Sequence, residues 1–249
     1  GNSSYAVSDG YRRNNSLRQK NGNLELNGMI NEKSSFHINI SAYDHYIELP
    51  GDVPVNAFSA GALNGKDGFT IDPRSTDTPM DFATKHGHKA LINSSYNFKN
   101  DFELINDASY RFNKSQGFFF GNSFTDTEMD VVAYNPKLKF KAQLFGYNLS
   151  MITGLDSSYT YYRSDRMGSN GGETNQVYKF SDSNLGLYFN SETQINSSSK
   201  LGFGARFQGN WLKATDFVGP ASGAFRTTNA DSLSYDPQYA FHLGFEKNF

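Results

Sequence analysis

Hydrophobic and polar residues alternate one by one through most of the chain. In residues 35–46, for example, the apolar Phe36 and Ile38 flank the polar His37. Comparable runs lie at 24–30, 90–98, 102–112, 147–161, 185–190, 201–211 and 239–249. A period of two places one kind of side chain on each face of a β-strand. Because no segment of similar length shows the period of a helix, the pattern predicts an all-β chain.

The predicted strands are long for a soluble protein. Most runs extend over roughly 11–15 residues, whereas soluble strands cluster near ~5–6 and membrane-crossing strands need ~9–11. Short polar connections at 31–34, 99–101 and 196–199 alternate with long Gly-, Ser-, Asn- and Asp-rich stretches at 47–83, 113–126, 164–182 and 214–236. This asymmetry is typical of outer-membrane barrels. We therefore expect an antiparallel transmembrane β-barrel wall with short periplasmic turns and long external loops.

Composition agrees with a wall that has one apolar and one wet face. Of the 249 residues, 15% are aromatic and only 19% are charged. The net charge of -2 argues against a nucleic-acid binder, which usually carries a basic excess. The absence of cysteine excludes disulfides and thiolate metal sites. No apolar run approaches the ~18 residues of a transmembrane helix, and the first residues do not resemble a signal peptide.

The predicted number of strands indicates whether this chain forms a whole barrel or part of a larger one. Counting from Ser16, we predict about nine strands, so that the chain enters on the long-loop side and leaves on the short-turn side. Bacterial single-chain barrels have an even number of strands. We therefore expect residues 1–249 to be one partial barrel domain, an internal piece of a larger barrel. The alternative is a tenth strand in residues 3–9, which contain Tyr5 and Val7.

Several short stretches resemble TonB-dependent outer-membrane receptors, and their order along the chain carries the resemblance. They are DGYRRNN and LRQ within 9–19, YIELPG at 46–51, YTYYRSD at 159–165, LGLYF at 185–189 with LGFGARF at 201–207, and YAFHLGFEKNF at 239–249. Asn190 or Ser191 stands where the family pattern usually has Gln.

The resemblance implies a 22-stranded barrel whose lumen is filled by an N-terminal plug. It also implies TonB-driven import of a scarce ligand, such as an iron–siderophore complex, haem or cobalamin, across the outer membrane of a Gram-negative bacterium. The implied partners are the plug domain, the TonB complex, outer-membrane lipid and lipopolysaccharide, and a small-molecule ligand that can be a metal chelate. Because neither a plug nor a TonB box is found in this sequence, no energy-coupling residue is assigned.

No residue pattern predicts catalysis, a resident metal or a cofactor. His86 and His88 share one side of a strand, about 7 Å apart. No clear third ligand accompanies them, which favours solvated histidines at the rim. Asp44 and His45 point to opposite faces of their strand, so they cannot form a hydrolytic Asp–His pair.

If the apolar face meets lipid, polar side chains line the lumen. The inward-pointing set is Glu25, His37, Asn39, Tyr43, His45, Asp107, Arg111, Asp156, Tyr162, Arg206 and Gln208. Most such residues in a plugged barrel bind the plug or water, but aromatic and Arg side chains near the mouth can stack on or pair with a bulky anionic ligand. The ligand-binding candidates in the lumen or mouth are Tyr43, His45, Arg74, Tyr162, Arg163 and Arg206.

Two other functions stay open at this point. A passive porin or small complete outer-membrane barrel predicts a charged constriction loop, a signal peptide and closure of the barrel by this chain alone. A secreted all-β glycan-binding module predicts shorter strands and solubility without detergent. The apolar alternation sustained through Leu149, Met151 and Leu155 argues against the module.

Overall fold

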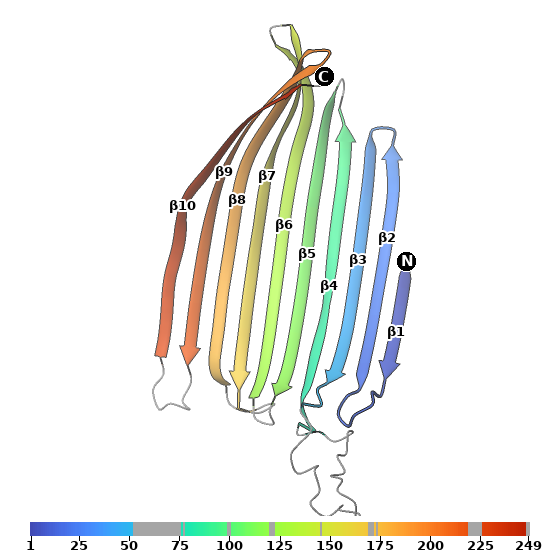
Figure 1. Ribbon diagram of the computed structural model, residues 1–249, viewed down its shortest axis with the longest axis vertical. Helices are drawn as coiled ribbons and strands as arrows, with labels where there is room; N and C mark the ends of the chain where they lie inside the picture. Colours follow the sequence, from blue (N-terminus) through green and yellow to red (C-terminus); the bar gives the residue numbers. More distant parts are fainter. Residues whose placement is uncertain are drawn as a thin grey trace, which may run out of the picture.

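The computed structural model describes residues 1–51, 76, 78–98, 101–119, 123–144, 146–168, 172, 174–218 and 226–247. These residues form one antiparallel sheet whose strands follow each other in chain order (Figure 1). The strands are β1 Asn2–Ser8, β2 Leu17–Asn31, β3 Ser34–Glu48, β4 Phe82–Asn97, β5 Phe102–Phe119, β6 Ser123–Leu144, β7 Tyr147–Met167, β8 Thr174–Asn196, β9 Ser199–Val218 and β10 Arg226–Lys247. The all-β prediction is confirmed. Across these ranges there is no helix long and apolar enough to cross a membrane.

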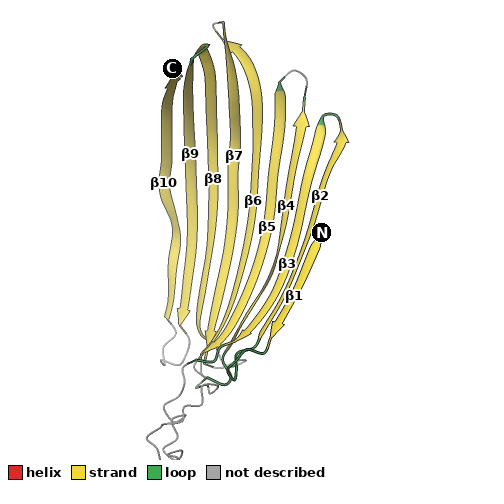
Figure 2. Cartoon of the chain, turned by 45° about the vertical axis from the view of Figure 1, so that its right-hand side comes forward, coloured by secondary structure: helices red, strands yellow, loops and turns green. Residues whose placement is uncertain are grey.

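The described residues form ten strands, one more than the roughly nine predicted. β1 pairs with β2 from Asn2↔Asn23 to Ser8↔Leu17, which is the additional strand considered for residues 3–9. Its alternation was too short to stand out in the sequence. β1 runs toward the long β3–β4 connection and β10 runs away from it (Figure 2). The argument from an odd strand number therefore fails.

The sheet is open in the part of the chain that is described. β1 pairs only with β2 there, and β10 pairs only with β9. β1 also covers only residues 17–23 of β2, so residues 24–31 have no described partner on that side.

The connections differ in length between the two ends of the sheet. The expected short turns are confirmed, because β2–β3, β4–β5 and β8–β9 are joined by 32–33, 98–101 and 197–198. The expected long loops at 113–126, 164–182 and 214–236 are mostly strand, and the connections there shrink to 120–122, 168–173 and 219–225. These segments lack an apolar alternation because, outside a bilayer, both faces of a strand can meet water. The connection at 49–81 is long, as expected.

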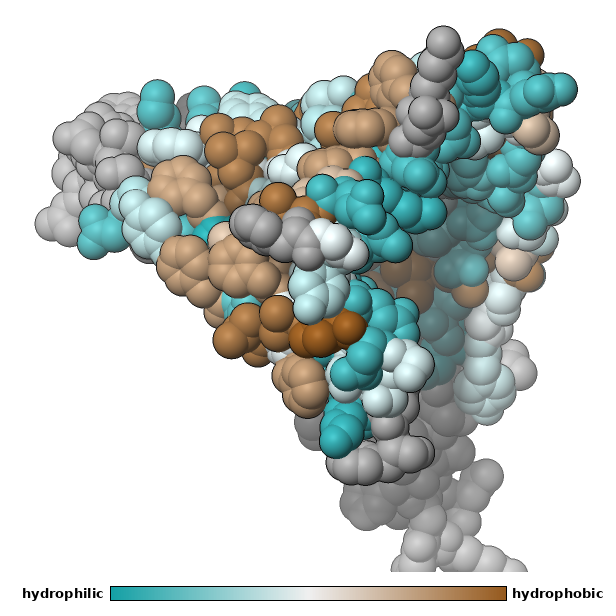
Figure 3. Space-filling model, turned by 90° about the horizontal axis from the view of Figure 1, so that it is seen from above, coloured by the Kyte–Doolittle hydropathy of each residue, from teal (hydrophilic) through white to brown (hydrophobic). Residues whose placement is uncertain are grey.

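The two faces of the sheet differ in chemistry. Residues that pair directly across strands point to the same face. One row, Ile38↔Ile92↔Ala108↔Tyr134, belongs to what we call the apolar face. The neighbouring row, His37↔Asn93↔Asp107↔Asn135, belongs to the polar face. Figure 3 shows hydrophobic side chains gathered on one side and hydrophilic side chains lining the other.

Within the described part of the chain, no second layer packs against the apolar face. Among the residues with described side chains, Phe118 and Phe124 are the only buried hydrophobic ones. In contrast, Leu187, Phe203 and Trp211 keep exposed fractions of 55%, 46% and 47%. Apolar surface of this extent needs another apolar medium to cover it, and a sheet closed into a barrel is one of the two structures that can span a bilayer.

The central strands are taller than a membrane requires. β6, β7 and β8 have 22, 21 and 23 residues, about 70 Å at ~3.3 Å per residue, whereas the lipid-facing band of such barrels is ~25 Å tall. Toward the long connection the apolar face becomes charged. Lys114 contacts Glu128 and Asp126 at 2.5 and 3.3 Å, and Arg163 contacts Asp165 at 2.8 Å. The wall thus extends beyond its apolar band at this end, which we call the mouth.

Asn14 joins the segment before β2 to both ends of the β3–β4 connection. Its side-chain amide donates to the carbonyl oxygens of Leu49, Thr78 and Asp81 at 3.0, 2.6 and 2.9 Å. Asn14 itself has a φ of 54°, in the left-handed region that Asn tolerates better than most residues. One side chain therefore links three backbone positions at the mouth.

Further contacts join the same segments. The Arg12 guanidinium donates to the carbonyl oxygen of Gly51 at 2.7 Å, and the Ser16 amide donates to the Glu48 carboxylate at 3.1 Å. Hydrogen bonding from Ser16 holds the pKa of the Glu48 carboxyl below its usual value. The two stretches 9–19 and 46–51, singled out in the sequence, thus contact each other as one structural unit.

Candidate functional site

The polar face gathers the whole inward-pointing set that the sequence predicts. The register places each of these residues in a row with other polar-face positions. For example, Tyr43 pairs with Asn21 and Gly87, and Asp156 pairs with Gly186. Strand alternation alone was enough to assign the face correctly, and the site is therefore built on this wall.

Tyr43 crosses from β3 to β5 near the mouth. Its hydroxyl donates to the Asn113 side-chain oxygen at 2.5 Å, passing over β4 at Gly87. A Cβ atom at Gly87 would lie 2.8 Å from the Tyr43 hydroxyl and 2.4 Å from the Phe112 carbonyl oxygen. The glycine therefore leaves the space that this hydrogen bond occupies.

His45 and Lys85 flank the Tyr43 ring. The rings of Tyr43 and His45 lie 5.3 Å apart, and the His45 Nε2 atom is 2.8 Å from the Asn21 side-chain oxygen. The Lys85 ammonium lies 5.8 Å from the centre of the Tyr43 ring, within the range of a cation–π contact. Tyr43 and His45, two predicted ligand candidates, thus share one cluster with a cation.

Two more cations lie on the same face beside this cluster. Lys89 is paired directly opposite Arg111 in the register of β4 and β5. Both side chains are exposed on the polar face, and Arg111 interacts electrostatically with Tyr43. The sequence placed Arg111 in the lumen but did not single out Lys85 or Lys89. Lys85 and Lys89 lie two positions before and two positions after Gly87. Strand alternation therefore places all three on one face of β4, and this spacing could have identified the two lysines.

An aromatic pair lies in the same row of paired residues as Tyr43. One row runs Tyr43↔Gly87↔Asn113↔Met129↔Tyr162↔Phe180. The rings of Tyr162 and Phe180 are stacked, with centres 4.8 Å apart. The predicted candidate Tyr162 therefore lies in the same row of paired residues as Tyr43, four strands away, and presents a flat aromatic surface on the polar face.

The remaining candidates do not join this cluster. Arg163 follows Tyr162 directly, so it points to the apolar face, where it pairs with Asp165. Of the two places expected for it, the lumen or the mouth, Arg163 lies at the mouth and not on the polar face. Arg206 lies on the polar face but farther from the mouth, where it donates to Asp156 at 2.8 Å. Arg74 lies outside the described residues.

Deeper in the wall, the charges of the polar face form ion pairs with one another. These pairs are Lys137–Asp107 at 2.7 Å, Lys139–Glu103 at 3.4 Å, Lys141–Asp101 at 3.1 Å and Arg206–Asp156 at 2.8 Å. Asp107 also accepts a hydrogen bond from Asn93 at 2.6 Å. This part of the wall satisfies its own charges.

The histidines on the other face act as part of an aromatic belt. The ring of His88 stacks on Phe112 with centres 5.2 Å apart and lies 5.6 Å from the Tyr110 ring. His86 lies 6.2 Å from the Phe112 ring. No group of three metal-ligating side chains occurs among the residues searched, which are those the structure describes.

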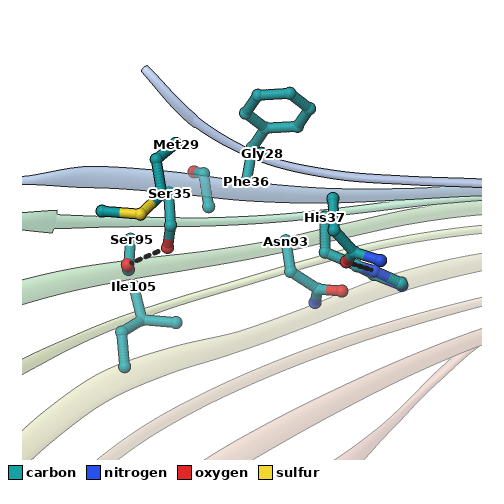
Figure 4. Close-up of a pocket in the computed structure, with 10 residues that line it drawn as sticks. Gly28, Met29, Ser35, Phe36, His37, Asn93, Ser95 and Ile105 are labelled. Atoms are coloured by element: carbon teal, nitrogen blue, oxygen red, sulfur yellow. Dashed lines mark hydrogen bonds between the residues drawn. The ribbon is translucent and has the colours of Figure 1, made fainter. Parts of the chain in front are cut away.

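An open pocket on the wall lies away from the mouth, between β2 and β5 near the short turns. It measures about 530 Å³ and is lined by Asn27, Gly28, Met29, Ser35, Phe36, His37, Asn93, Ser94, Ser95 and Ile105 (Figure 4). Within it the Ser35 and Ser95 hydroxyls are 2.7 Å apart, and His37 lies 2.6 Å from the Asn27 side-chain oxygen. His37 was placed in the lumen from the sequence, whereas the apolar Met29 and Ile105 in this cavity were missed.

Solved structures of uptake receptors have the same fold. The ferric yersiniabactin uptake receptor FyuA from Yersinia pestis matches with a TM-score of 0.67 and 12% identity, over 98% of this chain and 38% of that receptor. FpvA from P. aeruginosa, in a complex with a pyoverdine and iron, matches with 0.68 and 10%, over 99% and 35%. The ferric-catecholate import receptor Fiu from E. coli K12 matches with 0.62 and 10%, over 94% and 41%. Identities this low concern the fold alone.

The chain spans 33–44% of the length of the solved receptors it resembles. No protein-family model and no curated protein matches the sequence. The likeness covers nearly all of this chain, whose described strands form one sheet in chain order. The described sheet therefore has the fold of part of the barrel wall of the TonB-dependent outer-membrane receptors, the family that the sequence resembles.

Proposed function

We propose that residues 1–249 form one partial barrel domain of an outer-membrane receptor that imports a scarce ligand, such as an iron chelate, with energy from TonB. The observation that carries the proposal is the contrast between the faces. An exposed apolar face suits lipid, while the polar face holds Tyr43, Tyr162 and three cations near the mouth. The shared fold with receptors that import iron chelates supports it.

In this proposal, the wall binds the ligand and the plug moves. Tyr43, His45 and Tyr162 contact the ligand from the polar face, and Arg74 contacts it from the β3–β4 connection. Arg206 lies deeper and faces the plug domain. TonB then acts on the plug, not on the wall, and no bond of the ligand is made or broken. Lipid and lipopolysaccharide surround the apolar face.

The test begins with the native protein. Peptides from this chain are used to find its band in purified outer membranes of the Gram-negative source. We expect a band several times heavier than 27.8 kDa that also yields peptides of a plug domain. Deletion of the gene is expected to slow growth only when iron or another scarce nutrient is limiting.

Other results would support the other functions. A band near 27.8 kDa in the outer membrane, with unchanged growth under limitation, would point to a small passive barrel. Recovery only in the soluble fraction would remove the membrane assignment and favour a secreted binding module.

A further inference from the structure

We infer that the polar face carries a binding site for negatively charged oxygens of the imported ligand, formed by Lys85, Lys89 and Arg111. This inference rests on the proposed function and deepens it, because it names the class of ligand: a chelate that presents anionic oxygens to this wall. Tyr43 and Asn113 border the site.

The first argument is the placement of like charges. Lys89 and Arg111 are directly opposite in neighbouring strands, where Cβ atoms lie about 4.5–5.5 Å apart and like charges destabilise the pairing. Lys85 lies on the same face of β4, on the other side of Gly87, with its ammonium at the Tyr43 ring. A wall that keeps three cations this close together gains stability when an anion binds between them.

The second argument is the contrast with the rest of the wall. Each of the deeper cations Lys137, Lys139 and Arg206 has a carboxylate partner. In the described part of the chain, Lys85 and Arg111 form no ion pair, and the same holds for Lys89. The wall therefore neutralises its cations at depth and leaves them available near the mouth.

The acidic groups around the site are engaged elsewhere or distant. Glu25 faces His37 at 3.6 Å, and Asp107 is held by Lys137. Asp182 accepts a hydrogen bond from Asn184, and it lies in β8, three strands from Arg111, or about 14 Å at the usual strand spacing. The local field at the three cations is therefore positive.

The geometry also supplies neutral donors. The Asn113 side-chain oxygen accepts the hydrogen bond from Tyr43, which leaves the amide nitrogen as a donor on the polar face. Gly87 adds no side chain between the cations. Charged and neutral donors thus converge on one open surface, which suits carboxylate or catecholate oxygens.

The experiment compares iron(III) chelates of different charge on the native protein, purified from outer membranes in detergent. The probes are iron(III) citrate and iron(III) tris-catecholate, which are anionic, and iron(III) tris-hydroxamate, which is uncharged. We expect at least one anionic chelate to bind, and the double variant Lys89→Gln/Arg111→Gln to weaken that binding at least about tenfold. Raising the salt concentration should weaken binding to the wild type more than to the variant.

The matched control is Lys213→Gln, which makes the same change of charge on the apolar face at a similar height. It should leave chelate binding unchanged. Binding of only the uncharged chelate, or equal binding of an anionic chelate to the wild type and the double variant, would overturn the inference while the uptake function stands. The latter result would mean that an acidic group elsewhere in the protein occupies the site. Binding of none of the three chelates would count against both the inference and the proposed function.

Discussion

Gly87 allows two strands that are not neighbours to share a side-chain hydrogen bond. Tyr43 reaches from β3 to Asn113 in β5 across this glycine. A tyrosine ring also lies over a glycine deeper in the wall, where a Cβ at Gly154 would lie 2.5 Å from the Tyr188 hydroxyl. Glycine weakens a strand because it has no side chain to pack, and an aromatic ring laid over it restores contact. At the mouth, this device also fixes Tyr43 beside the cations.

Gly87→Ala is therefore expected to lower the free energy of unfolding by about 1–3 kcal/mol, because the new methyl group overlaps the Phe112 carbonyl and the Tyr43 hydroxyl. Gly22→Ala is the matched control. A Cβ at Gly22 meets no atom within 4 Å, so this change should stabilise the protein by roughly 0.4–1 kcal/mol through the unfolded state. Denaturant unfolding of both variants in detergent measures the difference. Equal effects would show that the space over Gly87 is not needed.

At the scale of the element, the strands themselves were predictable but their ends were not. Alternation is a local property, so it gave the correct face for residues such as His37 and Arg206. It did not reveal that β5 to β9 continue into the segments expected to be loops. It also failed in β6, where the adjacent Val131 and Val132 and the following Pro136 interrupt the pattern. Whether these regions form strand or loop depends on their pairing with neighbouring strands, and the sequence of a single strand does not reveal that pairing.

The unit at the mouth could be predicted only in part. The stretches 9–19 and 46–51 were recognisable by resemblance, but their mutual contacts depend on residues far apart in the sequence. Asn14 and Asp81 are 67 positions apart. The cation site shows the same limit. Lys85 and Lys89 can be recognised as part of a site only when the pairing of β4 with β5 places Arg111 beside them.

Replacement of Asn14 is expected to loosen the ends of the β3–β4 connection. Asn14→Ala removes three hydrogen bonds to backbone carbonyls and places alanine at a φ of 54°. Asn14→Gly removes the same hydrogen bonds but accepts the backbone conformation. Hydrogen exchange at the Leu49 amide, which donates to the Asp81 carbonyl at 3.0 Å, should accelerate in both variants and more in Asn14→Ala. Unchanged protection in Asn14→Gly would mean that the side chain does not hold the connection.

At the scale of the whole molecule, the sheet has no core of its own to make it independent of its surroundings. The apolar side chains point outward and the polar ones form networks on the other face, as in Lys137–Asp107. In the proposed receptor, stability therefore comes from strand pairing and from lipid on the apolar side. Exposed positions usually tolerate substitution, but here an exposed leucine is a sensitive position.

Leu187→Arg tests this orientation. Leu187 lies in the apolar band with an exposed fraction of 55%, and a charge there is expected to lower the free energy of unfolding in lipid vesicles by roughly 2–4 kcal/mol. Ser158→Arg adds the same group to the polar face of the adjacent strand and should cost much less. If Ser158→Arg were the more damaging change, the assignment of the faces would be reversed.

The isolated chain of residues 1–249 is not expected to refold into a stable monomer in detergent or lipid. The free edges of β1 and β10 leave rows of backbone groups unpaired, and each such group costs several kcal/mol in hydrocarbon. Recovery of a monodisperse monomer whose mobility on a gel changes on heating would contradict this prediction. Aggregation of this chain, alongside refolding of the longer native protein under the same conditions, would agree with it.

In the proposed receptor, the height of the wall separates capture of the ligand from its passage through the membrane. Tyr162, in the same row of paired residues as Tyr43, is seven residues along β7 from Leu155, which belongs to the apolar band. That length is about 23 Å along the strand, or about 16–19 Å along the membrane normal at the usual tilt of ~35–45°. Leu155 and the part of the apolar band nearer the short turns therefore lie below a ligand held there. Binding can therefore come to equilibrium with the medium outside the cell, and one variant can lose affinity while another loses only the rate of transport.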